Sequence, residues 1–245
     1  MEIVTKFGAG ELLWAGMRHP RLAIRFLRGR SPSCIDIDEF GRMLPPTAVI
    51  IEAGCADGMD TLEFAKRWPR GRIIALEPVP CLASLASSGL QALKNVESFA
   101  VALSGNGDSQ VVMHSGDETN MSSSVLKPTS HKEYFPEIKF DQLVCVPAVS
   151  LDELVLQLAV VAIDLLWLDL QGYELAVLRG GGLDALSRTS YVHLEVAKRQ
   201  MYEGAPLWRE VYSFMDEQGF SPIIERVPIA FGNVLFKKRT PTDKS

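Results

Sequence analysis

Acidic residues and glycines follow the first strongly apolar run of the sequence. Glu52 and Gly54 stand at the end of that run, and Gly58 and Asp60 come shortly after. Gly54 permits a tight turn, and Gly58 lets a ligand approach the backbone where a helix begins. Negative charge on both sides of the turn would repel the phosphates of a dinucleotide. The pattern therefore favours a ligand that carries an ammonium or sulfonium group.

A second acidic residue, Glu77, follows the next apolar run, 25 positions after Glu52. That interval suits one strand–helix–strand unit, and a carboxylate at such a strand end can accept both hydroxyls of a ribose. Ala56 stands where a dinucleotide fingerprint has the glycine that admits a pyrophosphate. Together these residues predict an adenosine-type ligand without a diphosphate. The alternative is a glycine turn in an unrelated α/β fold, with Glu77 on its surface.

The elements that must position these residues alternate between strands and helices. We expect main strands over residues 48–53, 72–76, 96–103, 164–170, 191–196, 220–225 and 229–236, further strands over 110–114 and 144–149, and helices over 59–68, 81–93, 151–158, 173–179 and 207–218. The last two strands are joined by so few residues that they must be antiparallel. The sequence thus predicts an α/β, Rossmann-like, doubly wound, mostly parallel seven-stranded sheet with an antiparallel last strand and helices on both faces.

Three segments are expected along the chain. Apolar residues at helical spacing predict an N-terminal helical extension over residues 1–44, followed by one domain over 45–240 and a tail over 241–245. Residues 115–141 are polar and include Ser123 and Ser124, and a loop of this length is often a binding loop.

The composition, 47% hydrophobic and 22% charged over 245 residues, is that of a soluble globular protein. Neither a transmembrane segment nor a signal peptide is expected, and four widely spaced cysteines suit the reducing cytoplasm. The net charge of −5 argues against nucleic-acid binding. Residues 1–30 nevertheless carry +4, which suits either an anionic partner or a solvated helical arm.

The motif around Glu52 and Glu77 resembles that of class I S-adenosylmethionine-dependent methyltransferases. Residues 167–180 (WLDLQGYELAVLRG) resemble the signature of the FkbM family, with Gln171 where that family often has Glu, and the resemblance extends over residues 47–238. It implies S-adenosylmethionine as the cofactor and S-adenosylhomocysteine as its product. The cofactor-binding positions are then Glu52, Ala53, Gly54, Gly58, Asp60, Thr61, Glu77, Pro78, Ala102 and Asp169.

Candidate catalytic residues lie at the ends of the later strands. Asp169 stands at the end of a strongly apolar strand, where burying a charge costs free energy and therefore suggests a functional role. With Glu174, it is expected to position or deprotonate the acceptor, assisted by His193 or Glu195, which share one face of a strand. The alternatives are a Glu174 that opposes the helix dipole, a His193 in the core, and a Glu195 paired with a nearby cation. Ser123, Ser124 and Tyr202 are the expected substrate contacts, and no metal is expected.

The function that these features favour is methylation of a hydroxyl on a sugar or polyketide-like small molecule. An amine acceptor is compatible with the same fold. The competing hypotheses are a non-catalytic nucleoside-binding scaffold and a nicotinamide-dependent oxidoreductase, which Ala56 and the acidic flanks disfavour. Oligomerisation stays open, and the sequence names no particular acceptor.

Overall fold

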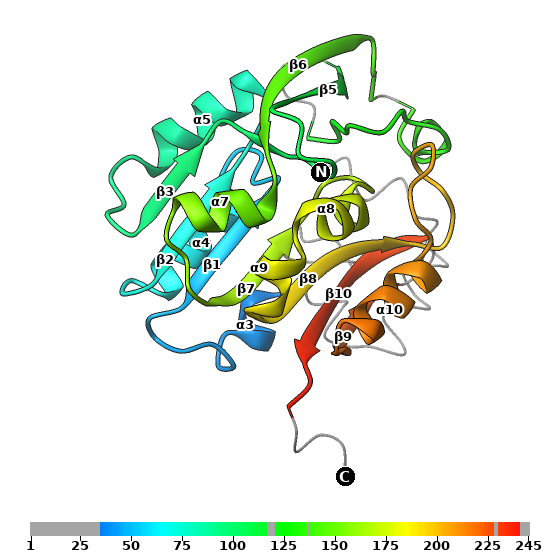
Figure 1. Cartoon of the computed structure of the whole chain (residues 1–245). Helices are drawn as coiled ribbons and strands as arrows, with labels where there is room; N and C mark the ends of the chain where they lie inside the picture. The colour runs from blue at the N-terminus through cyan, green and yellow to red at the C-terminus, as the bar shows by residue number, and fades with distance from the viewer. Residues whose placement is uncertain (1–34, 117–120, 137, 228–229, 241–245) are drawn as a thin grey trace, which may run out of the picture.

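A seven-stranded sheet forms the centre of the computed structural model, which describes residues 35–116, 121–136, 138–227 and 230–240 (Figure 1). The strand order is β3-β2-β1-β7-β8-β10-β9. These strands are β1 (Val49–Ala53), β2 (Arg72–Leu76), β3 (Val96–Phe99), β7 (Ile163–Leu168), β8 (Thr189–Ala197), β9 (Phe220–Arg226) and β10 (Phe231–Lys238). Neighbours from β3 to β8 are parallel, whereas β10 is antiparallel to both β8 and β9. The predicted fold class, including the antiparallel last strand, is confirmed.

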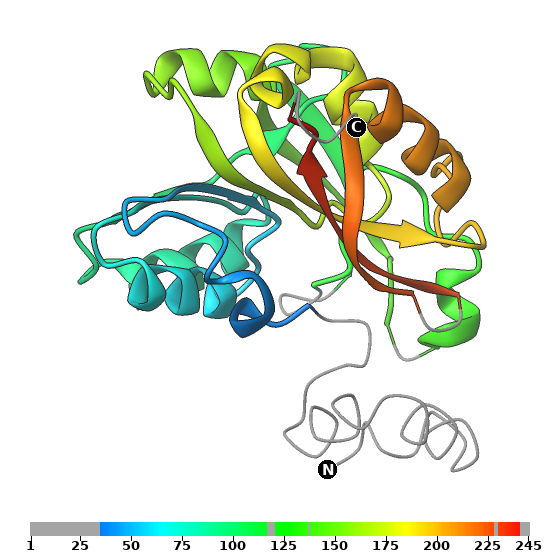
Figure 2. The ribbon, with the colours of Figure 1, turned by 90° about the horizontal axis from the view of Figure 1, so that it is seen from below.

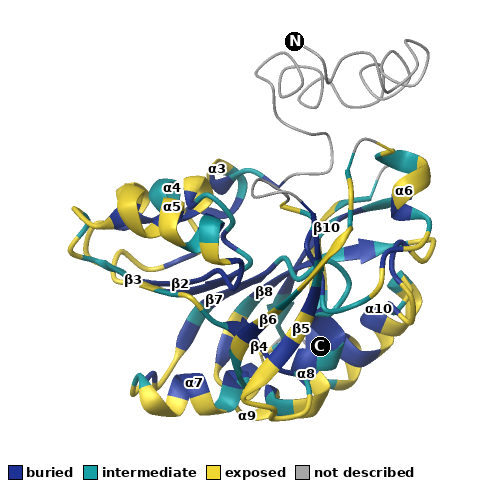
Figure 3. Ribbon diagram, turned by 90° about the horizontal axis from the view of Figure 1, so that it is seen from above, coloured by how far each residue is buried: buried dark blue, intermediate teal, exposed yellow. Residues whose placement is uncertain are grey.

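Helices cover both faces of this sheet, as Figures 2 and 3 show. One face carries α3 (Ile37–Phe40), α4 (Met59–Arg67) and α5 (Pro80–Leu90); the other carries α7 (Leu151–Gln157), α8 (Glu174–Gly181), α9 (Leu183–Ser187) and α10 (Trp208–Glu217). Successive side chains of a strand point to opposite faces, so β1 places Ile50 in one core and Ile51 in the other. Burial on both sides explains why β1 and β7 read as continuous apolar runs.

A second, three-stranded sheet corrects the prediction of one strand over residues 96–103. The chain leaves the main sheet after Phe99, and β4 (Ala102–Leu103) pairs instead with β6 (Gln142–Val149), which also pairs with β5 (Gln110–Ser115). Between β5 and β6, the predicted polar loop contains a short helix, α6 (His131–Tyr134), and forms isolated bridges to His114 and Tyr202. This small sheet forms a wall beside the carboxyl ends of β1 and β2 (Figure 1).

The strand expected over 164–170 ends at Leu168, which leaves Asp169 directly beyond the sheet. The helix expected over 173–179, with the glycines at 180–182 as its stop, runs from Glu174 to Gly181 and has Gly182 as its C-cap. Gly180 serves close packing instead, because a Cβ atom there would lie 1.4 Å from the carbonyl oxygen of Gly105.

Most of the predicted N-terminal extension and the whole predicted tail over 241–245 lie outside the described residues. Of the extension, residues 35–44 are described and contain α3, whose start is fixed by Asp36 and Glu39 in a capping box. Within the described ranges, no helix is long and apolar enough to span a lipid bilayer.

Candidate active site

The turn between β1 and α4 brings the chain close to the end of β7. Gly54 has φ +85°, and a Cβ atom there would lie 2.0 Å from the carbonyl oxygen of Asp169. The Asp169 N–H in turn donates to the carbonyl of Ala53 at 3.0 Å. Only glycine permits both this backbone conformation and this approach. The glycine turn therefore packs against the end of β7. The ends of the adjacent parallel strands β1 and β7 together form one surface, which we call the floor of the site.

Glu77, directly after β2, points into the space above this floor. Its two carboxylate oxygens accept hydrogen bonds from the N–H groups of Ala56 at 2.9 Å and Val79 at 2.8 Å. These bonds fix the carboxylate and leave each oxygen a further lone pair. Burial raises the pKa of Glu77 to about 7, against the hydrogen bonds from Val79 and Ala56, which lower it. Near neutral pH this group is poised to accept two hydroxyl donors.

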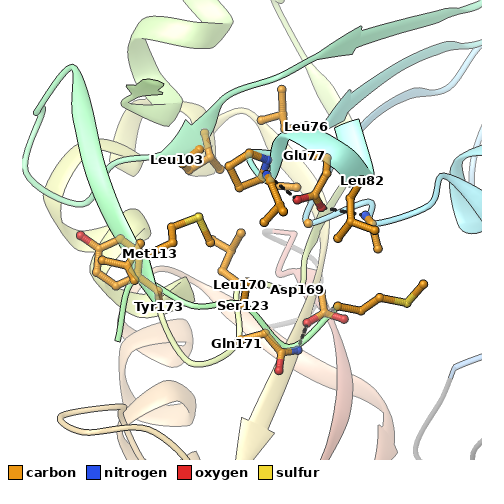
Figure 4. A pocket seen from close by; sticks show the side chains of 18 of the residues that line it. Leu76, Glu77, Leu82, Leu103, Met113, Ser123, Asp169, Leu170, Gln171 and Tyr173 are labelled. Carbon is orange, nitrogen blue, oxygen red and sulfur yellow. Dashed lines mark hydrogen bonds between the residues drawn. The ribbon is translucent and has the colours of Figure 1, made fainter. Parts of the chain in front are cut away.

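A cavity opens beside Glu77, between the main sheet and the second sheet (Figure 4). Leu82, Leu103 and Met113 supply apolar surface, and Glu77 and Asp169 supply charge. Six of the ten predicted cofactor residues line it: Ala53, Gly54, Glu77, Pro78, Ala102 and Asp169. A cavity with an apolar slot and few convergent polar groups is typical of a small-molecule site.

Asp169 also lines a second cavity, on the α3–α4 face of the sheet. The other lining residues are Ile35, Asp60, Glu63, Trp167, His193 and Asn233. One carboxylate oxygen of Asp169, Oδ1, accepts a hydrogen bond from Gln171 Nε2 at 2.6 Å, as the dashed line in Figure 4 marks. Asp169 is thus the shared wall of two cavities.

Comparison with known proteins identifies the family to which this chain belongs. Residues 52–222 match the methyltransferase FkbM domain. The 2-O-methyltransferase NoeI of Sinorhizobium fredii (strain NBRC 101917 / NGR234) is 30% identical over 164 residues, which cover 65% of this chain and 67% of that protein. The chain belongs to the FkbM methyltransferase family. It is an enzyme, and its methyl donor is S-adenosylmethionine.

Among solved structures, the methyltransferase FkbM of Methylobacillus flagellatus KT superimposes on this chain with a TM-score of 0.50 at 12% identity. The match covers 78% of this chain and 44% of that one. This likeness supports the fold alone, and the chain spans less than half of that larger protein.

The first cavity fits the donor of an FkbM methyltransferase. The apolar slot matches a purine, the fixed Glu77 carboxylate matches a ribose diol, and Asp169 lies where a cationic group would be stabilised. An ionised Asp169 attracts a sulfonium more strongly than it attracts a neutral thioether.

Glu52 and Thr61 are not among the described residues that line the first cavity. The Thr61 hydroxyl donates to Glu52 Oε2 at 2.5 Å, and both residues are buried. Burial raises the pKa of Glu52 to about 8. Of the remaining predicted donor residues, Gly58 caps α4 with φ +80°, and Asp60 faces the second cavity. Gly58 and Asp60 are also absent from the described lining of the first cavity, so four of the ten predicted donor residues lie outside it.

Glu174 and Glu195 form an acidic cluster with Asp169. Glu174 Oε1 accepts hydrogen bonds from the N–H groups of Leu170 at 2.7 Å and Gly172 at 3.3 Å, so this side chain holds the turn that follows Asp169. Burial raises the pKa of Glu174 to about 7 and raises that of Glu195 further above its ordinary value, with the charges of Asp169 and Glu174 adding to the effect on Glu195.

The nearby cations have other partners than Glu195. Lys198 Nζ donates to the carbonyl of Val227, and Arg199 pairs with Glu133 at 3.6 Å. The described residues therefore do not show the predicted alternative, in which one of these cations pairs with Glu195.

His193 lies in the wall of the second cavity with 2% of its surface exposed. Its ring stacks on Trp167 with centroids 3.4 Å apart and planes 4° apart. Burial lowers the pKa of His193 to about 3, so the imidazole is neutral at physiological pH. Within the described part of the chain, neither ring nitrogen has a hydrogen-bond partner. His193 is therefore packed like a core residue while it also lines a cavity.

The three predicted substrate contacts are buried, Ser123 and Ser124 in the loop between β5 and β6 and Tyr202 in the segment after β8. Ser123 lines this cavity and shares a hydrogen bond with Ser115 at 2.8 Å. Ser124 Oγ donates to the carbonyl of Gln171 at 3.0 Å, and the Tyr202 hydroxyl lies 2.9 Å from both Gln171 Oε1 and the carbonyl oxygen of Ser122. Ser124 and Tyr202 therefore anchor the loop to the turn after Asp169.

Sequence reasoning missed part of each cavity wall. Met113 and Val125 reach the donor cavity from the second sheet and its loop, while Trp167 and Asn233 line the second cavity. Trp167 precedes Asp169 by two positions, so strand alternation could have placed both side chains on one face of the sheet. No local signal marks the others.

Proposed function

We propose that this FkbM-family enzyme transfers a methyl group from S-adenosylmethionine to a hydroxyl of a small molecule, a sugar or a polyketide-like compound. The observation that carries the proposal is the position of Asp169 between two cavities, one of which suits the donor. The similarity to a 2-O-methyltransferase supports oxygen as the accepting atom.

Glu77 receives the two ribose hydroxyls of the donor. Its carboxylate is held by two backbone N–H groups, so little reorganisation is needed when the ligand enters. The glycine turn passes beneath the donor, and the acidic cluster around Asp169 stabilises the positive sulfonium. When the donor becomes S-adenosylhomocysteine this charge is lost, which favours release of the product.

The transfer itself needs an acceptor oxygen held in line with the methyl carbon. As the new C–O bond forms, the C–S bond breaks and its electron pair stays on sulfur. The hydroxyl proton passes to a carboxylate, and Asp169 is the residue placed for this because it borders the acceptor side. Burial raises the pKa of Asp169, while the hydrogen bond from Gln171 lowers it. A carboxylate with a raised pKa is a better base near neutral pH.

Glu195 and His193 assist Asp169 in this proposal, and Glu174 positions the turn that carries it. The acceptor is a small molecule rather than a nucleic acid, consistent with the net charge of −5. Among the described residues, Cys55 and Cys145 form no disulfide, which supports action in the cytoplasm.

Isothermal calorimetry with S-adenosylmethionine, S-adenosylhomocysteine and NAD tests the donor side. We expect micromolar binding of the first two ligands and none of NAD. The acceptor side is tested by incubating the enzyme and donor with hydroxylated compounds and measuring the mass gain of one methyl group. Donor binding without transfer to any acceptor would favour a nucleoside-binding scaffold, and binding of NAD alone would overturn the proposal.

A further inference from the structure

Gln171 stands two positions after Asp169 and has a strained backbone. Its φ is +54°, in the left-handed region that residues other than glycine rarely adopt. Such strain persists only where the surrounding structure holds it, and it is concentrated at functional sites. Here the Ser124 hydroxyl donates to the Gln171 carbonyl at 3.0 Å. The turn keeps a glutamine where a glycine would cost less free energy, which points to a role for the glutamine side chain.

The side-chain amide of Gln171 links Asp169 to Tyr202. Its Nε2 donates to Asp169 Oδ1 at 2.6 Å, and its Oε1 accepts from the Tyr202 hydroxyl at 2.9 Å (Figure 4 shows the first bond). An ionised carboxylate can only accept, so the amide must turn its NH2 group toward an ionised Asp169. Because the Tyr202 hydroxyl donates to the amide oxygen, it favours this orientation of the amide.

The Tyr202 hydroxyl has two acceptors within reach and one proton to donate. It lies 2.9 Å from Gln171 Oε1 and 2.9 Å from the carbonyl oxygen of Ser122. A hydroxyl proton forms a full hydrogen bond with only one acceptor at a time. Ser122 lies between Met121 and Ser123, and both of these neighbours line the donor cavity. The choice between the two acceptors is therefore transmitted to the wall of the donor cavity.

Protonation of Asp169 reverses the direction of these hydrogen bonds. A carboxylic acid donates through its O–H group, so the group that matches it is the amide oxygen of Gln171. Rotation of the amide by half a turn brings Oε1 to Asp169 and Nε2 to Tyr202. The Tyr202 oxygen then accepts from Nε2, and its own proton goes to the carbonyl of Ser122. Each group keeps a partner, with donors and acceptors exchanged.

We propose that Tyr202 and Gln171 are positioning residues for Asp169, and that their hydrogen bonds connect its protonation state to the loop beside the donor. The inference rests on the proposed function, in which Asp169 takes the proton of the acceptor hydroxyl. Arrival of this proton moves the hydrogen bond of Tyr202 from Gln171 to Ser122. In this assignment Tyr202 acts through Gln171 and does not contact the acceptor.

Other titratable groups lie on the elements packed around Asp169. They are Glu52 on β1, Glu77 after β2, Asp60 and Glu63 on α4, Glu174 on α8, and His193 and Glu195 on β8. Their charges act through space, whether or not Tyr202 carries a hydroxyl. A signal that travels through the hydrogen bonds requires that hydroxyl, so its removal separates the two effects.

The test follows three NMR signals of the full, ligand-free chain as the pH is changed. They are the carboxyl carbon of Asp169, the side-chain amide nitrogen of Gln171 and the methyl carbon of Met121, which reports on the loop. Substitution of each residue assigns its signal. Tyr202→Phe removes the hydroxyl and keeps the ring. Tyr212→Phe is the matched control, because the Tyr212 hydroxyl donates to Glu225 at the other end of the sheet.

In the wild type and in Tyr212→Phe, we expect the three signals to change with one shared midpoint. In Tyr202→Phe, the Met121 signal should lose this transition, and Asp169 should titrate at higher pH because its donor is less well oriented. Gln171→Gly suits the left-handed backbone, so it should fold. It should lower the acid dissociation constant of Asp169 by roughly tenfold or more, the effect of one lost hydrogen bond to a charged group.

Two results would overturn the assignment. One is a Met121 signal that still follows Asp169 in Tyr202→Phe or in Gln171→Gly, and the other is a wild-type Gln171 amide that does not follow Asp169. Gln171→Gly decides the first point alone if Tyr202→Phe does not fold. Failure of the proposed function is distinguishable, because methyl transfer would then be absent from the mass assay while the three signals stay linked.

Discussion

Substitution of Glu77 by Gln tests the donor site most directly. The side chain keeps its shape, but one oxygen becomes an NH2 group that must face a backbone N–H of Ala56 or Val79. At least one ribose hydroxyl then loses its charged acceptor. A hydrogen bond to a charged group contributes about 1.5–3 kcal/mol, so the affinity for S-adenosylhomocysteine should fall by roughly 10- to 100-fold at pH 8.

The pH dependence gives a second, independent magnitude. Only the ionised carboxylate accepts both hydroxyls, and the pKa of Glu77 is about 7 in the ligand-free protein. Protonation should therefore weaken wild-type binding by about tenfold between pH 8 and pH 6. The Gln variant lacks this titration, so its deficit relative to the wild type should shrink at pH 6.

Calorimetry at both pH values measures these effects, with Glu153→Gln on the distant helix α7 as the control. If wild type and the Glu77 variant bind S-adenosylhomocysteine equally at pH 8, the ribose assignment is wrong. If they differ by the same factor at both pH values, the titrating group is another residue.

Four further outcomes are expected. Asp169→Asn should bind S-adenosylhomocysteine but transfer methyl groups at least about a hundredfold more slowly, and full turnover in a mass assay would remove Asp169 from the mechanism. Glu52 has a pKa of about 8 in the fold, against 4.5 as its ordinary value, so its contribution to the free energy of unfolding falls by about 1.4 kcal/mol for each pH unit as pH rises through this interval. Urea denaturation at pH 6 and pH 8 should show a smaller loss in Glu52→Gln. Gly54→Ala should lower the melting temperature by roughly 5 °C or more, because the new Cβ atom would meet the Asp169 carbonyl; an unchanged melting curve would contradict this close approach. Gln171→Leu removes the donor to Asp169, so the acidic limb of the rate profile should move to higher pH, and an unmoved limb would show that this bond does not tune Asp169.

The sequence by itself determined the family, the sheet and the residues at the strand ends. Parallel strands that are buried on both faces are largely apolar, which marks them in the sequence. A glycine turn, with an acidic residue at the end of each of the first two strands, is also a local pattern. Glu77 and Asp169 could be found this way because each directly follows a strand, and parallel strands align their carboxyl ends at one edge.

Tertiary structure decided the rest. Whether the residues near Asp169 line a ligand site or support one depends on side-chain direction and on distant partners. The Glu174 side chain accepts a hydrogen bond from the backbone of the turn that precedes it. The Tyr202 hydroxyl forms a hydrogen bond with Gln171, which is 31 positions away in the sequence. The chain leaves the main sheet after Phe99 because β4 pairs with β6. This pairing joins distant parts of the sequence, so strand propensity cannot predict it. The second cavity is lined from β7, β8, β10 and α4, so only the folded chain shows that none of the described residues bonds the buried ring nitrogens of His193.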